Sequence, residues 1–93
     1  MIRSFASRRC ELFFREDICP AQWQAFADVA KRKLDMLDAA NKLLDLRSPP
    51  GNRLEALKGD REGQHSIRIN DQFRVCFRWA DNGPTDVEIV DYH

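Results

Sequence analysis

Apolar residues in the first half of the chain recur at the spacing of amphipathic helices. Between residue 20 and about residue 40 they fall mostly three or four positions apart on one helical stripe, which Leu44 continues. Pro20 suits the first turn of this helix, where its missing N–H needs no partner. Residues 7–16 form a shorter charged segment with an apolar side and predict another helix against the core. The alternation over residues 1–5 favours a first strand.

The second half alternates between apolar and polar residues, as half-buried strands do. From residue 73 to residue 79 every second residue is large and apolar, and Arg74 and Arg78 lie between them. The dipeptide Asn70-Asp71 predicts a tight turn that joins this strand to the one before it. The other segments with strand character are residues 53–57, 64–70 and 86–93.

Two connections separate these elements. Residues 41–52 contain two prolines followed by glycine, which no regular element continues, so they form a turn between the helical half and the strand half. Residues 58–63 form a polar loop that contains two glycines. The order of elements predicts an α+β fold, in which two N-terminal helices pack on one face of an antiparallel sheet of about four to five strands.

Composition limits the class of protein. The chain has 93 residues, of which 43% are apolar and 32% charged, so residues 1–93 are expected to form one globular domain. No apolar run is long enough for a membrane span or a secretory signal, which predicts a cytoplasmic protein without membrane association. The three cysteines are widely spaced and odd in number, so they are expected to be reduced, and neither a metal nor another cofactor is expected.

Charge is distributed unevenly along a neutral chain. Fifteen basic residues balance fifteen acidic ones, but residues 47–78 hold seven basic and four acidic residues. Strand parity places Arg68, Arg74 and Arg78 together on the exposed face of the sheet, where they would suit the phosphates of an anionic ligand. The structural alternative is that these arginines pair with carboxylates such as Glu55 and Glu88 and only solvate that face.

Groups that move protons end the sequence. Asp91, Tyr92 and His93 supply a carboxylate, a phenol and an imidazole, and Lys58 adds a cation that can stabilise developing negative charge. Terminal residues often fray, so such a triplet is weak evidence alone. Beside cations that hold a phosphate, however, these groups are the ingredients of RNA cleavage.

Three segments resemble a known family. They are Leu-Lys-Gly-Asp at residues 57–60, Ile-Arg-Ile-Asn-Asp-Gln-Phe-Arg at residues 67–74 and Val-Asp-Tyr-His at residues 90–93. In this order they resemble the HigB-type toxins of bacterial toxin–antitoxin systems, within the RelE/ParE superfamily, and most of all the GraT-type members. The similarity extends to the start of the chain and implies a RelE-like fold.

The resemblance implies a ribosome-dependent endoribonuclease that cuts messenger RNA by attack of the ribose 2′-OH on the adjacent phosphate. It marks Lys58, Asp91, Tyr92 and His93 as catalytic, with Arg68 and Arg74 as RNA contacts. In this assignment His93 is an acid or base, Tyr92 positions a base, and Asp91 either orients His93 or acts as a base itself.

One position departs from many relatives, which carry histidine three residues before the lysine. This chain has Glu55 there, either a general base or a neutraliser of Lys58, and a nuclease that is weaker or differs in its pH dependence is expected. His65, close by in the sequence, is expected to pack rather than to react.

The resemblance also implies partners. They are a HigA-type helix-turn-helix antitoxin, the ribosome with its messenger RNA, and operator DNA only through the antitoxin. Two alternatives stay open: a ParE-like inhibitor of DNA gyrase with the same fold, and a non-enzymatic module whose arginine face binds an acidic protein.

Overall fold

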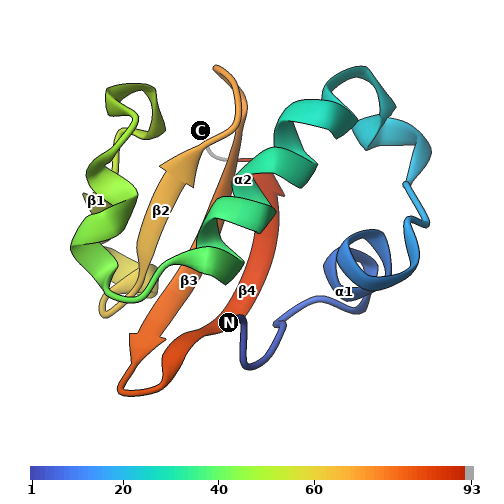
Figure 1. The fold of residues 1–93 in the computed structure, drawn as a ribbon. Coiled ribbons are helices and arrows are strands. Elements are labelled where there is room, and N and C mark those ends of the chain that lie inside the picture. Colours follow the sequence, from blue (N-terminus) through green and yellow to red (C-terminus); the bar gives the residue numbers. More distant parts are fainter. Residues whose placement is uncertain (92–93) are drawn as a thin grey trace.

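Helices and sheet form two layers. The computed structural model describes residues 1–91. Four strands form an antiparallel sheet in chain order, with α2 lying across one face and α1 beside β4 (Figure 1). The main elements are α1 (Arg8–Glu16), α2 (Ala27–Ala39), β1 (Glu55–Ala56), β2 (His65–Arg68), β3 (Phe73–Ala80) and β4 (Gly83–Asp91). The described residues also contain four short 3-10 turns: η1 (Ala21–Phe26), η2 (Leu43–Arg47), η3 (Pro50–Asn52) and η4 (Gly59–Arg61).

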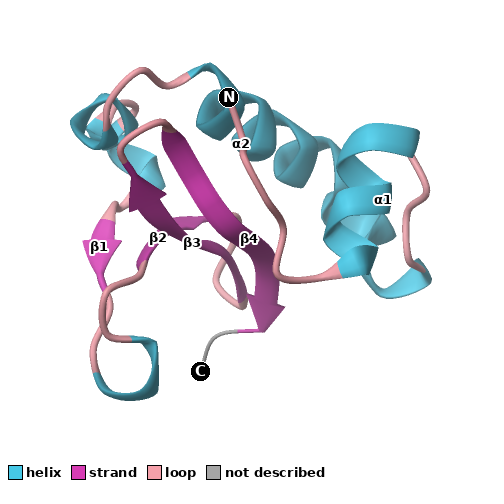
Figure 2. Ribbon diagram, turned by 90° about the horizontal axis from the view of Figure 1, so that it is seen from below, coloured by secondary structure: helices cyan, strands magenta, loops and turns pink. Residues whose placement is uncertain are grey.

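The core lies between the helices and the sheet. Seen from below, both helices lie on one side of the strands, which confirms the predicted α+β class (Figure 2). Ala30, Leu34 and Leu37 of α2 are buried, as their helical spacing predicts. They belong to one apolar cluster with buried residues of the sheet, namely Ile67, Val75, Phe77, Val87 and Ile89. Within residues 1–91, neither helix is long and apolar enough to cross a membrane.

The predicted helix over residues 20–40 is wrong in its first third. Trp23 N donates to the Pro20 carbonyl at 2.9 Å, so the segment winds as a 3-10 turn, and α2 begins only at Ala27. The helix ends where Ala40 turns extended, at ψ 134°. Leu44 therefore does not continue the buried stripe and is 59% exposed.

The segment over residues 41–52, expected to be a turn, contains regular structure. It contains η2 and η3, and it buries Leu46 and Asn52. The Asn52 amide Nδ2 donates to the Leu46 carbonyl at 3.1 Å, which holds the two 3-10 turns together. The sequence pattern predicted a break in regular structure but gave no sign of a buried asparagine.

The strand predicted for residues 1–5 is reduced to one bridge. Phe5 pairs with Val87 in the parallel direction, so the N-terminal segment lies along β4 without adding an antiparallel strand. The β4 strand bulges at this place: its register with β3 shifts between Cys76 and Arg78, and Asp86 has φ 52°. Ser4 Oγ accepts a hydrogen bond from Asp86 N at 2.9 Å, which fixes the bulge.

All three cysteines are free thiols, as predicted. Burial raises the pKa of the Cys10 thiol to about 12 and that of Cys76 to about 11, so both stay protonated at neutral pH. Cys19 is only partly buried.

We expect an aromatic disulfide reagent at pH 7.5 to label one thiol per folded chain rapidly and three thiols after denaturation. A Cys19→Ser variant should lose the rapid reaction. Rapid labelling of two or three thiols in the folded protein would contradict this packing.

Candidate functional site

The face of the sheet opposite α2 carries four of the eight predicted site residues, namely Glu55, Arg68, Arg74 and Arg78. Register aligns Arg68 with Arg74, and Ser66 with both Glu55 and Cys76. Paired residues point to the same side of a sheet, and Ile67 and Val75 point to the other side, into the core. We call the side away from α2 the polar face; its members are Glu55, Ser66, Arg68, Arg74, Cys76, Arg78 and Glu88.

Arg74 is the centre of this face and is largely buried. Its side chain is 11% exposed. The guanidinium donates from Nε to Ser66 Oγ and from Nη2 to the Arg53 carbonyl, each at 2.7 Å, and Nη2 lies 3.6 Å from Glu55 Oε1. The expectation of three exposed arginines is therefore wrong for Arg74, because neighbouring strands supply it with partners.

Arg68 and Arg78 are more accessible, but each has a carboxylate nearby. Arg68 pairs with Asp71, whose side chain is fully exposed, and Arg78 Nε lies 3.7 Å from Asp86 Oδ2. The structural alternative thus describes part of this face correctly. Exposed pairs of this kind contribute about 0–1 kcal/mol, so an incoming phosphate can displace the carboxylate at little cost.

The η4 turn folds over the polar face. Arg61 Nη1 lies 3.0 Å from Glu88 Oε1 on β4 and donates to Gln64 Oε1 at 3.1 Å. Gly63 has φ 90°, a backbone conformation that is strained for residues with a Cβ, and a Cβ there would also lie 2.7 Å from Arg78 Nη1 and require that side chain to shift. Cys76 is fully buried beneath, and Arg61, Glu88 and Arg74 all influence its pKa.

Sequence reasoning missed Arg61 as a member of the site. The residue lies in a loop, 27 positions from Glu88, and nothing in a loop sequence indicates which distant strand it will contact. Glu88 itself was detectable, because it alternates with the buried Val87 and Ile89 and so faces the other side of β4.

Lys58 immediately precedes η4 and is exposed. Within residues 1–91 its ammonium has no side-chain partner, whereas the nearby Glu55 is half-exposed beside Arg74. An exposed, unpaired ammonium keeps its charge available for an anion. Lys58 and Glu55 therefore supply a cation and a carboxylate at the β1 edge of the sheet.

Asp91, the predicted acid at the end of β4, does not lie on the polar face. Asp91 pairs with Phe73, so it shares the face of the core residues and not the polar face. Its Oδ2 accepts a hydrogen bond from Gln72 Nε2 at 2.9 Å. Tyr92 and His93 lie outside the described residues. His65, expected to pack, stacks on Phe77 with ring centroids 6.3 Å apart.

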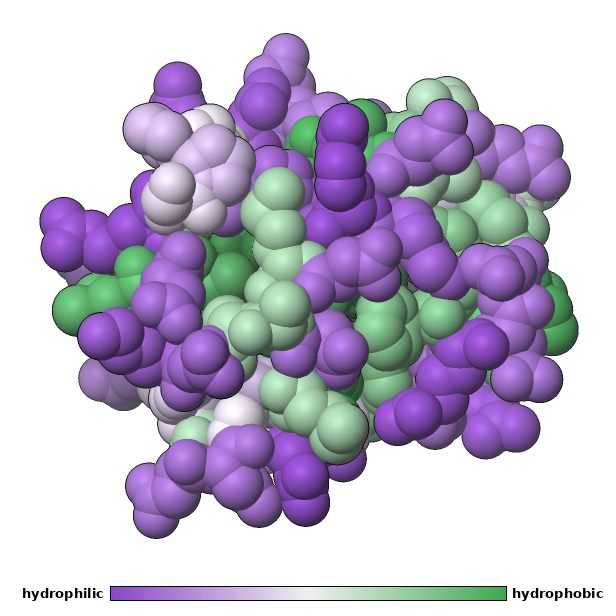
Figure 3. All heavy atoms as spheres, viewed as in Figure 1, coloured by the Kyte–Doolittle hydropathy of each residue, from purple (hydrophilic) through white to green (hydrophobic). Residues whose placement is uncertain are grey.

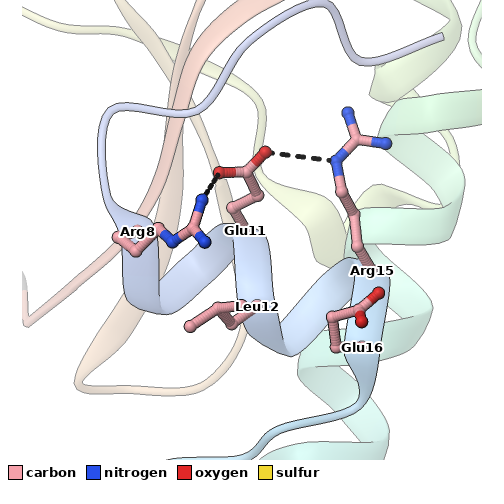
Figure 4. A pocket seen from close by; sticks show the side chains of 5 residues that line it. All are labelled: Arg8, Glu11, Leu12, Arg15 and Glu16. Carbon is pink, nitrogen blue, oxygen red and sulfur yellow. Dashed lines mark hydrogen bonds and ion pairs between the residues drawn. The ribbon is translucent and has the colours of Figure 1, made fainter.

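A surface hollow on α1 contains none of these residues (Figure 4). It is lined by Arg8, Glu11, Leu12, Arg15 and Glu16. Two ion pairs cross it, from Glu11 to Arg8 at 3.3 Å and to Arg15 at 3.4 Å. The charges in the hollow compensate one another, so we assign it no part in the site.

The chain is similar to a described protein family, to known proteins and to a solved structure. A family model described as the RelE-like toxin of type II toxin–antitoxin system HigB matches residues 3–93. Toxin HigB-1 of Vibrio cholerae is 40% identical over 85 residues, which are 87% of this chain and 86% of that protein. Endoribonuclease HigB of Proteus vulgaris is 28% identical over 93 residues and the full length of both chains. The YoeB-YefM complex from Staphylococcus aureus contains a similar fold, with a TM-score of 0.62 and 18% identity over 100% of this chain and 98% of that one.

Proposed function

The chain belongs to the family of RelE-like HigB toxins of type II toxin–antitoxin systems, and we propose that it is an endoribonuclease that cleaves messenger RNA on the ribosome. The proposal rests on the polar face, where Arg68 and Arg78 are accessible, and on Lys58 beside β1, whose ammonium has no side-chain partner within residues 1–91. The name of the relative from Proteus vulgaris, an endoribonuclease, supports the same reaction.

Cleavage requires three tasks at one phosphodiester. A base removes the proton of the ribose 2′-OH, the 2′-oxygen forms a bond to phosphorus, and the bond from phosphorus to the 5′-oxygen breaks. The products are a 2′,3′-cyclic phosphate and a 5′-hydroxyl, whose oxygen takes a proton from an acid. Cations are needed throughout, because the pentavalent phosphorus carries extra negative charge.

Cations and proton-transfer groups of this chain have separate roles in the proposed reaction. Lys58 stabilises the charge of the transition state, and Arg68 and Arg78 bind phosphates after their carboxylate partners move aside. Arg74 positions this surface, since its guanidinium already has three partners. Glu55 and His93 are the candidates for base and acid; Tyr92 positions a nucleobase, and Asp91 acts as an orienting group or base at the end of β4.

We also propose partners and a compartment for this toxin. As a type II family member the chain has an antitoxin partner, and we propose that it is a HigA-type helix-turn-helix protein through which the pair reaches operator DNA. The ribosome presents the messenger RNA. From these proposed partners we infer that the toxin acts in the cytoplasm.

Glu55 gives a direct test of the base. In a Glu55→His variant, an imidazole with an ordinary pKa of about 6.5 replaces the carboxylate. We expect faster cleavage, by up to about 10-fold, and a rate that falls as pH drops below about 6.5, because the protonated imidazole cannot accept a proton. The measurement is the initial cleavage rate between pH 5 and 8. An unchanged rate with an unchanged pH profile would show that position 55 is not a catalytic group.

The chemistry itself is tested by product analysis. Ribosomes programmed with a short message should yield fragments that end in a 2′,3′-cyclic phosphate, detectable by mass spectrometry. A single 2′-deoxy substitution at the cleaved nucleotide should abolish cleavage there. Fragments with a simple 3′-hydroxyl, or cleavage of the deoxy message, would refute the mechanism.

A further inference from the structure

A second group of cations lies where α2 meets η3. Lys33 Nζ donates to Asn52 Oδ1 at 2.5 Å. Asn52 is fully buried and bonds in turn to the Leu46 carbonyl, so the lysine is held at a defined place. Lys33 itself is only partly buried, and its neighbour Arg32 is exposed. The ammonium thus reaches the surface from an ordered anchor.

This group is continuous with the polar face. Arg53 follows Asn52, is exposed, and has φ 46°; its carbonyl accepts the hydrogen bond from Arg74. The η3 turn also contacts β2, which ends at Arg68. Two hydrogen bonds therefore connect Lys33 to Arg74: Lys33 bonds to Asn52, and Arg74 bonds to the carbonyl of the next residue, Arg53. We call Arg32, Lys33, Arg53 and Arg68 the cationic strip.

Most of the charges on this strip are not compensated. Arg32, Lys33 and Arg53 form no ion pair in the part of the chain that the structure describes, in contrast to Arg8 and Arg15 of α1. The pKa of Lys33 is lowered, first by desolvation and then by the charges of Arg32 and Arg68. Hydrophilic side chains cover much of this side of the molecule, around apolar patches (Figure 3). Like charges held together repel, and a bound polyanion relieves that repulsion.

We propose that the cationic strip binds the phosphates of the RNA strand beyond the cleaved bond, so that the substrate runs from the polar face around the β1–β2 edge to α2. This inference rests on the proposed nuclease function. RNA fits better than an acidic protein because the strip continues directly from the face assigned to the scissile phosphate, and a nucleic-acid backbone supplies charges at regular intervals.

The test is the salt dependence of RNA binding by the intact chain. The probe is a fluorescent 12-nucleotide RNA that carries 2′-O-methyl groups throughout and so cannot be cleaved. In an Arg32→Gln/Lys33→Gln variant, loss of two phosphate contacts should weaken binding roughly 10- to 30-fold near 0.1 M salt and reduce the slope of log K against log salt by about 1.4. Glutamine at position 33 keeps an amide donor for Asn52, and thermal unfolding checks the fold.

A matched control variant removes two positive charges from α1 instead of from the cationic strip. Arg8→Gln/Arg15→Gln also loses two positive charges, but on α1 (Figure 4). It should bind the RNA within about twofold of the original chain. Arg53→Gln provides a second variant of the strip, with a slope lower by about 0.7. Equal affinity of the strip variants and the original chain, an equal loss in the control, or no RNA binding by the original chain would each overturn the strip. Cleavage on ribosomes by the unaltered chain tests the nuclease function separately.

Discussion

Replacing Lys58 by alanine is expected to lower the cleavage rate by about 10²- to 10³-fold, without a comparable loss of stability. One preorganised group that stabilises transition-state charge contributes about 3–4 kcal/mol in such sites. Lys58 is exposed and its ammonium has no side-chain partner among residues 1–91, so its removal should change the free energy of unfolding by no more than about 0.5 kcal/mol. Single-turnover cleavage and urea denaturation measure the two quantities.

Lys58→Arg is the matched variant, because it retains a positive charge with a different shape. It should retain more activity than the alanine variant. Full activity of Lys58→Ala would remove lysine from the proposed mechanism, and a large loss of stability would mean that the residue has a structural role instead.

Replacing Arg74 by alanine is expected to cost about 3 kcal/mol of stability as well as most of the activity. The change leaves the buried Ser66 hydroxyl and the Arg53 carbonyl without their donor, and it leaves Glu55 without its cation. The loss of activity follows because β1 and β2 then lose a common anchor beneath the polar face. Urea denaturation gives the free energy of unfolding.

Arg74→Lys separates charge from shape. A lysine ammonium keeps the charge but cannot reproduce the planar fork that reaches both Ser66 and Arg53, so most of the stability should remain lost. If Arg74 acted mainly by binding RNA, Arg74→Ala would unfold at the urea concentration of the original chain and lose only activity. That result would contradict the positioning role.

The strands were predictable because their pattern reflects burial directly. Large apolar residues occupy every second position from 73 to 79. Residues 73, 75 and 77 face α2, and residues 74, 76 and 78 lie on the polar face. The helix start was not predictable to the same accuracy, since a 3-10 turn and an α-helix place Trp23 and Phe26 on similar sides. Nor does any local pattern indicate that Ser4 fixes a bulge at Asp86, because the two residues are 82 positions apart in the chain.

The site was predictable as a set of residues but not as a set of contacts. Parity placed Arg68 and Arg74 on one face, and the structure agrees. It could not indicate that Arg74 is largely buried, because that depends on the Arg53 carbonyl and on Glu55 from another strand. The same limit applies to Asp91, which the sequence groups with its neighbours and the register places on the opposite side of β4 from Glu88.

We propose that this chain cuts messenger RNA with groups of the polar face and of the C-terminal residues. The most direct test is to induce the chain without its antitoxin and map the 5′ ends of cellular messages, beside Lys58→Ala and a variant that lacks His93. New 5′-hydroxyl ends within coding sequences are expected for the original chain and should be strongly reduced in both variants. Intact messages in all three strains, or equal cleavage in all three, would contradict the claim.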